Sequence, residues 1–127
     1  MKITILSFGY RYGLPRADTI LDMRCLDNPF WCEELREKTG LDRPVQEYIF
    51  SNPNSTAYAD KLFKLLTTQI ACAEGRQDIQ RNGCGQLNVA LGCTGGRHRS
   101  VAMAEHLAAA LSRCGHEVEL HHRDVNR

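Results

Sequence analysis

The chain has 127 residues, a formal net charge of +1 and 43 % hydrophobic residues. This length and composition predict a single domain over residues 1–127 with a hydrophobic core of its own, and they exclude two independently folded domains. The near-neutral charge excludes a broadly basic nucleic-acid-binding surface, so any site for a polyanion has to be local.

The first apolar run and the cysteines indicate where the protein acts. Residues 3–6 form an apolar run that is too short for a signal peptide or a membrane span. The six cysteines contain no Cys-x-x-Cys pair and no zinc-binding spacing with histidine. We therefore expect a cytoplasmic protein without membrane contact, whose thiols are reduced and mostly lie in the core, and we expect neither a structural metal nor a cofactor.

Short strands and helices are predicted in the first part of the chain. Residues 2–8 are β-branched and apolar and predict a buried strand, and residues 19–24 predict a second, shorter strand. A brief helix is expected over residues 33–38. Residues 42–50 predict another helix, with Asp42 as its N-cap.

The longest predicted helix occupies the middle of the chain. Asn54 or Ser55 is expected to cap it, and Gly75 to end it. Its apolar residues fall on one broad face. They are Ala59, Leu62, Phe63, Leu65, Leu66 and Ile70. Residues 77–85 are polar, contain two glycines and predict an exposed loop.

The last third alternates strand, helix and strand. A strand from residue 87 leads into a helix over residues 100–113, which Gly115 ends, and residues 117–121 predict a half-exposed edge strand. The residues of this helix that are expected to face inward are Val101, Ala104, Leu107, Ala108 and Leu111. The whole pattern predicts an α/β fold, a mostly parallel sheet with helices on its faces.

The most informative segment is the turn between that strand and that helix. Gly95 and Gly96 allow positive φ, so that successive N–H groups can converge on an anion at the positive end of the helix dipole. The candidate ligand-binding residues here are Thr94, Gly95, Gly96, Arg97, His98, Arg99 and Ser100. The alternative is a tight turn with solvated arginines.

Two other loops are expected to meet this turn. Ligands of parallel α/β sheets bind beyond the carboxyl ends of the strands, which brings residues 7–13 and 24–31 to residues 93–100. The candidates added from these loops are Ser7, Gly9, Arg11 and Arg24. Phe30 and Trp31 have two interpretations, stacking on a base or sugar and packing beneath the loop.

The same turn allows one enzymatic interpretation. Cys93, five intervening residues, Arg99 and Ser100 match the spacing of the phosphate loop in cysteine-dependent phosphatases, with Cys93 as nucleophile and Arg99 as phosphate clamp. Gly92 stands where those enzymes usually carry histidine, and no separate loop presents a general acid. Cys93 can equally be a small buried residue at the end of a strand. No Walker A loop is present in the chain, so ATP hydrolysis has no support.

Several blocks of the sequence resemble, in order, the C-terminal domain of the RNase adapter protein RapZ. They include Ser-Phe-Gly-Tyr-Arg-Tyr-Gly-Leu-Pro at 7–15, Asn-Pro-Phe-Trp at 28–31 and Gly-Cys-Thr-Gly-Gly-Arg-His-Arg-Ser-Val at 92–101. The resemblance implies an α/β unit like a phosphofructokinase subdomain, which binds small regulatory RNA and glucosamine-6-phosphate and assembles into oligomers. It also implies a binding role rather than a catalytic one for Thr94, Gly95, His98 and Arg99.

The sequence departs from that family in three places. Phe30 replaces a histidine of the sugar-phosphate pocket. We also expect the N-terminal nucleotide-binding domain to be absent and the basic tail to be reduced to residues 123–127. The loss of tail cations removes phosphate contacts and is expected to weaken RNA binding. We therefore predict a stand-alone, non-enzymatic adaptor or sensor domain. Its expected partners are a phosphorylated small molecule, RNA or both, together with further copies of itself and a protein partner.

Overall fold

The computed structural model describes residues 2–75 and 85–127. Its strands are β1 (Lys2–Gly9), β2 (Thr19–Asp22), β3 (Gln86–Cys93) and β4 (Glu117–His122). Its α-helices are α1 (Arg43–Phe50), α2 (Pro53–Glu74) and α4 (Arg99–Arg113), and its single-turn 3₁₀ helices are η1 (Tyr10–Tyr12) and η2 (Pro29–Trp31). Most of the loop predicted at 77–85 lies outside the described residues.

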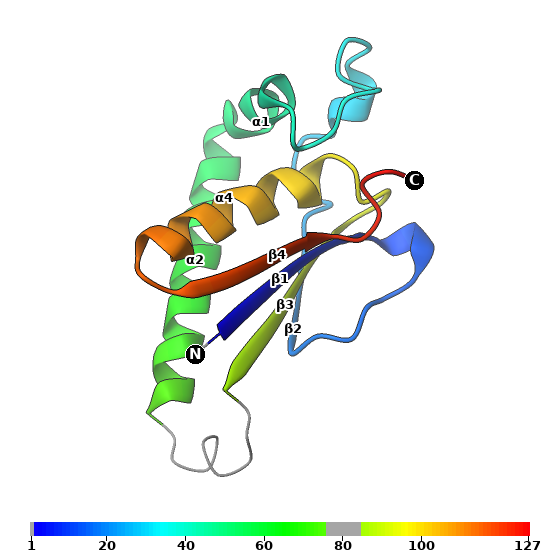
Figure 1. Cartoon of the computed structure of the whole chain (residues 1–127). Helices are drawn as coiled ribbons and strands as arrows, with labels where there is room; N and C mark the ends of the chain where they lie inside the picture. Colours follow the sequence, from blue (N-terminus) through cyan, green and yellow to red (C-terminus); the bar gives the residue numbers. More distant parts are fainter. Residues whose placement is uncertain (1, 76–84) are drawn as a thin grey trace.

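The four strands form one sheet in the order β2-β3-β1-β4 (Figure 1). Every pairing is parallel, and Ile5 in the central strand β1 lies opposite Val89 of β3 and Leu120 of β4. The predicted α/β fold with a parallel sheet is confirmed, and so is the edge position of the last strand. Because the strands are parallel, the loops after β1, β2 and β3 leave the same edge of the sheet.

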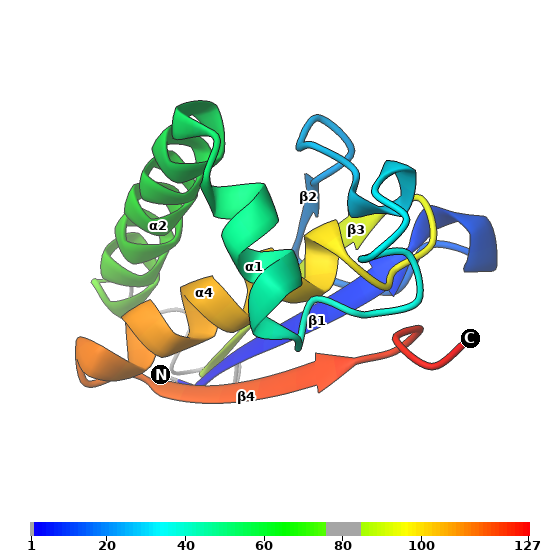
Figure 2. The same cartoon turned by 90° about the horizontal axis from the view of Figure 1, so that it is seen from above.

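All three α-helices lie on one face of the sheet (Figures 1 and 2). On that face the side chains of Ile3 and Ile5 are fully buried. The opposite face of β1 carries Lys2, Thr4 and Leu6, which are only half-buried. This face is left without helices in the described part of the chain because several of its residues are polar and tolerate water.

Helix α2 begins two to three residues earlier than the predicted caps. Asn52 is the N-cap, and its Oδ1 accepts a hydrogen bond of 2.9 Å from the N–H of Asn54. The expected cap at Asn54 or Ser55 is wrong because Pro53 already fits the first helical position. The predicted apolar face packs into the core except for Leu65, which is exposed.

The helix expected over residues 33–38 is wrong. This stretch consists of consecutive turns, with hydrogen bonds such as that from Leu35 N–H to Cys32 O at 2.9 Å. Leu35 is its one buried apolar residue, so an isolated turn of helix gains too little burial to offset its nucleation cost. Asp42 is the N-cap of α1 as expected, but its carboxylate accepts the N–H of Thr39 rather than capping the helix.

Helix α4 covers the sheet and carries the predicted buried face. All five residues expected to face inward are buried. The chain leaves the helix through Gly115 at φ +88°, as predicted. Within residues 2–75 and 85–127 no helix has the length and apolar character needed to cross a bilayer.

Candidate phosphate-binding site

The turn from β3 into α4 lies directly on the end of β1. Gly96 has φ +74°, and a Cβ atom placed on it would approach Gly9 N to 2.5 Å. A Cβ on Gly9 would likewise lie 2.5 Å from Gly95 C. The two backbones therefore touch, and this contact requires glycine on both sides.

A second segment holds the turn from the side of α4. Gly40 N–H donates to Arg97 O at 2.8 Å, and a Cβ on Gly40 would lie 2.4 Å from Ala102 N. On the other side, Arg11 N–H donates to Thr94 O at 3.1 Å. The conformation of the turn is thus fixed by contacts with residues far away in the sequence.

The described residues make no use of the backbone N–H groups of this turn. In the described part of the chain, none of the N–H groups from Thr94 to Arg99 donates to a protein acceptor. His98 is the N-cap of α4, but its side chain makes no capping hydrogen bond. A helix N-terminus with unused donors and a positive dipole end is a site for an anion.

Arg99 adds a buried cation at the same place. The residue is only 6 % exposed, and its Nη1 donates to Arg24 O at 2.8 Å and to Leu26 O at 3.3 Å. Its Nε and Nη2 donate to no acceptor within residues 2–75 and 85–127, although Arg99 lines the cavity described below. Two donors of a fixed guanidinium are therefore left for an oxyanion.

His98 is buried at the turn, and its imidazole has a lowered pKa. It is 7 % exposed, and burial together with the neighbouring Arg97 lowers the pKa of the imidazole, although the carbonyls of residues 35, 36 and 38 partly oppose this. Its Nε2 is buried without a hydrogen-bond partner in the described residues. A neutral ring can offer either a donor or an acceptor to a ligand.

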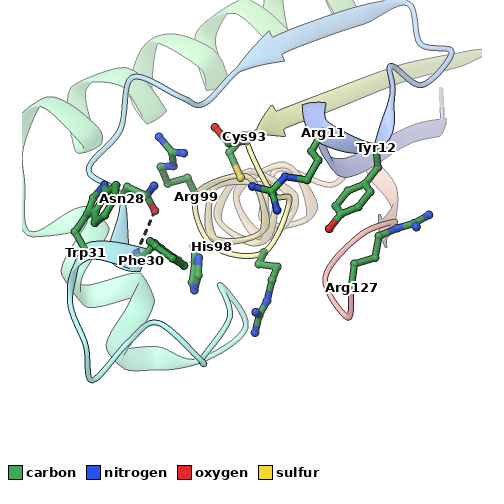
Figure 3. Close-up of a pocket in the computed structure, with 12 residues that line it drawn as sticks. Arg11, Tyr12, Asn28, Phe30, Trp31, Cys93, His98, Arg99 and Arg127 are labelled. Atoms are coloured by element: carbon green, nitrogen blue, oxygen red, sulfur yellow. Dashed lines mark hydrogen bonds between the residues drawn. The ribbon is translucent and has the colours of Figure 1, made fainter.

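A cavity of about 460 Å³ opens at this edge of the sheet. It brings together the loops that follow β1, β2 and β3, which confirms their predicted convergence, and the C-terminal residue Arg127 joins them. Figure 3 shows the residues that line it. They are Arg11, Tyr12, Asn28, Phe30, Trp31, Cys93, Thr94, Gly95, Arg97, His98, Arg99 and Arg127.

Five candidates lie outside this cavity lining. Ser7 is buried and its Oγ lies 2.6 Å from His122 Nδ1, and Arg24 pairs with Asp22 on the surface. The other three are Gly9, Gly96 and Ser100, which shape the turn instead. Direct ligand contact stays a prediction for Arg11 and for the lining residues of the turn.

Sequence reasoning missed the structural role of Asp124. This carboxylate is fully buried and accepts the N–H of Gly9 at 2.7 Å, together with hydrogen bonds from Arg123 and Arg127. Burial alone would raise its pKa, but these three donors lower it overall. Asp124 thereby fastens the C-terminus to β1 and holds Arg127, whose guanidinium lies 4.6 Å from the Tyr12 ring, at the cavity.

Comparison with known proteins identifies the family of the chain. The profile of the family described as the RapZ C-terminal domain matches residues 1–126. The chain belongs to this family. Over its whole length it is 45 % identical to a protein of Streptomyces coelicolor, 43 % to one of Heliobacterium modesticaldum and 45 % to one of Frankia alni, all named nucleotide-binding proteins. It covers 41 %, 40 % and 42 % of those proteins, so it spans about two fifths of the length of these relatives.

The Asn-Pro-Phe-Trp block of this RapZ-like domain forms one wall of the cavity. Phe30 is 44 % exposed and Trp31 is 76 % exposed, so the interpretation that both pack beneath the loop is wrong. Sequence alone does not separate the two interpretations, because the exposure of an aromatic residue in a loop depends on what the fold places over it.

Cys93 is the one buried thiol among the five described cysteines. Cys25, Cys72 and Cys114 are exposed, so the expectation that most thiols lie in the core is wrong. The Sγ of Cys93 lies 3.2 Å from Ser100 Oγ and accepts the Ser100 N–H at 3.4 Å. In the described part of the chain no three side chains of His, Cys, Asp or Glu gather as a metal site requires.

Proposed function

We propose that this domain is an adaptor or sensor that binds a phosphorylated small molecule, with the phosphate held by residues 94–99. One observation carries the proposal: six consecutive backbone N–H groups are unused by the described fold beside the fixed guanidinium of Arg99. Backbone donors at a helix start, joined by a forked cation, match the oxygens of a phosphate.

The size of the cavity favours a small ligand over a polymer. Its volume of about 460 Å³ lies in the range of small-molecule sites. The chain has a net charge of only +1, whereas binding of an RNA backbone relies on many cations. The relatives are named nucleotide-binding proteins, and this supports a ligand-binding role without saying which part of those longer proteins binds.

Calorimetry with inorganic phosphate, glucose 6-phosphate and ribose 5-phosphate tests the proposal. We expect saturable binding that Arg99→Lys weakens about tenfold, because lysine keeps the charge but loses the fork. Arg43→Lys is the matched control, because Arg43 is an exposed arginine on α1 that pairs with Glu47. Failure of all three compounds to bind, or equal loss in both variants, would contradict the proposal.

RNA binding is tested separately by filter binding. If the turn binds an RNA backbone, affinity falls with salt and falls further in Arg97→Ala and Arg99→Lys. Affinity that responds to neither change excludes RNA at this site. The resemblance to the RapZ C-terminal domain also predicts self-association, which light scattering on the purified chain measures.

The contacts of Cys93 favour one alternative, a cysteine-dependent phosphatase. Ser100 donates its N–H to the Cys93 sulfur, and Cys93 and Arg99 line the same cavity, as a nucleophile and a phosphate clamp would. A phosphatase assay of the wild type beside Cys93→Ser decides between the two functions. Activity that disappears with the thiol would overturn the adaptor proposal, and the absence of turnover in a protein that binds phosphate supports it.

A further inference from the structure

The cavity has two chemically different walls on either side of the turn. Figure 3 shows Phe30 and Trp31 on one side, and Arg11, Tyr12 and Arg127 on the other. The rings of Phe30 and Trp31 meet edge to face, with centroids 5.3 Å apart. Large aromatic side chains left exposed beside a cavity indicate recognition of a ligand.

Phe30 is fixed in place by its neighbours. Its N–H donates to Asn28 Oδ1 at 3.1 Å, and its carbonyl accepts a hydrogen bond of 2.9 Å from Arg36 Nε. The guanidinium of Arg36 also lies 4.9 Å from the centroid of the Phe30 ring. The ring is therefore held before a ligand arrives, and a preorganised surface binds with less loss of entropy.

We propose that the ligand of this cavity is a nucleotide, whose phosphate occupies residues 94–99 and whose base stacks on Phe30 beside Trp31. The inference rests on the proposed phosphate site and adds the identity of the rest of the ligand. A base offers a flat π face to an aromatic ring. A simple sugar phosphate would fill the turn and leave the apolar wall in water.

Polar groups lie between the two ends where a nucleotide needs them. Asn28 lines the cavity, and while its Oδ1 accepts from Phe30, its Nδ2 has no partner within residues 2–75 and 85–127. His98 lies beside Phe30 in Figure 3, and its Nε2 is likewise unpaired. These groups are available to the sugar hydroxyls or the base edge, while the Nε and Nη2 of Arg99, which have no partner among the described residues, are available to the phosphate.

Fluorescence of Trp31 tests the inference directly, because Trp31 is the sole tryptophan of the chain. The full chain is titrated with AMP, GMP, CMP and UMP, with ribose 5-phosphate as the matched probe without a base and adenosine as the probe without a phosphate. We expect at least one nucleotide to quench the fluorescence and to bind about tenfold more tightly than ribose 5-phosphate, which equals about 1.4 kcal/mol at 25 °C. Ribose 5-phosphate should bind without quenching.

Two substitutions at one position separate stacking from folding. Phe30→Ala should reduce nucleotide affinity to that of ribose 5-phosphate and leave ribose 5-phosphate binding unchanged. Phe30→Tyr keeps the ring and should keep the preference for the nucleotide. Because Phe30 is half-exposed, both variants are expected to melt near the wild-type temperature.

The possible results distinguish failure of the stacking site from failure of the phosphate site. Equal affinity for ribose 5-phosphate and every nucleotide overturns the stacking site while the phosphate site stands. Binding of adenosine as tight as that of AMP, or no binding of any phosphate compound, overturns the proposed function itself. Binding of single-stranded RNA without any mononucleotide binding overturns the small-ligand form of both proposals.

Discussion

The starts of α2 and α4 differ in how they use their backbone donors. Asn52 caps α2 with its own side chain, and Pro53 removes one donor from the first turn. At α4 the N-cap His98 makes no capping hydrogen bond, and no other described residue supplies an acceptor for the donors before the helix. Both helices pack on the same core, so packing alone does not explain the difference.

The comparison teaches that the start of α4 is held by groups other than its own caps. Close contacts with Gly9 and Gly40 fix the backbone at the start of α4, and the Asp124 carboxylate holds Gly9 by accepting its N–H. The start of α2 is capped by its own residue Asn52. The start of α4 is positioned by contacts with other segments, and its unpaired N–H donors lie beside a cavity. Unused donors at a fixed helix start are what an anion-binding site requires.

The largest effect is expected from Gly96→Ala. The new Cβ would meet Gly9 N at 2.5 Å and the residue would keep φ +74°, so we expect a loss of about 2–4 kcal/mol in the free energy of unfolding. Urea denaturation measures this loss. Gly95→Ala is the matched control, because its Cβ meets nothing within 4 Å. Equal stability of the two variants would show that the turn is not held against β1.

Asp124→Asn should have the next largest effect. Loss of the charged acceptor for Gly9, Arg123 and Arg127 is expected to cost about 2 kcal/mol and to weaken phosphate binding through Arg127. The pKa of Asp124 is lowered in the folded protein. Its contribution is therefore present above the ordinary carboxyl pKa and is lost as pH falls below about 4.

Thermal melting from pH 2 to pH 7 checks this prediction. The wild type should lose more stability than Asp124→Asn in the acid range. Parallel curves for the two proteins would contradict the role of Asp124 as an ionised clamp.

Asn52→Ala sharpens the comparison from the other side. It removes the cap of α2 and should cost about 1 kcal/mol of stability. Because Asn52 lies away from the 460 Å³ cavity, phosphate affinity should stay unchanged. A fall in affinity as large as that of Arg99→Lys would mean that the two helix starts are coupled.

The smallest effect is expected from the titration of His98. Burial and Arg97 lower the pKa of this imidazole, while nearby carbonyls partly compensate. The stabilisation by the neutral ring is therefore present above the ordinary histidine pKa and declines as pH falls below about 6.5. His98→Gln should flatten the dependence of melting temperature on pH between 7.5 and 5.5. A steeper dependence in the variant would contradict this sign.

Elements with their own local signals were predicted well. The β-branched run of β1, the Gly-rich turn after Cys93 and the stop at Gly115 depend on residue type and spacing, which sequence shows directly. The predictions were wrong where the same residues fit two local structures. Residues 33–38 have helix-forming composition but only Leu35 to bury. Asn52, Asn54 and Ser55 are all suitable N-caps, and Pro53 selects Asn52 because proline fits the first position of the helix.

The sequence does not show which of the candidate arginines line the cavity. Arg11, Arg97 and Arg99 were predicted to converge because parallel strands end at one edge, and the cavity lining contains all three. Nothing in the sequence separated them from Arg24, which instead pairs with Asp22. The four arginines are chemically identical, and they differ only in the residues that the fold places beside them.

The sequence by itself determined the alternation of strands and helices, the parallel sheet and the chemical character of residues 94–100, because these depend on periodicity and on the backbone freedom of glycine. The tertiary structure decided which donors stay free. The clamp of Asp124 on Gly9 joins residues 115 positions apart, and it exists only because β1 lies between β3 and β4. Contacts of this range depend on strand order and register, which local patterns do not encode.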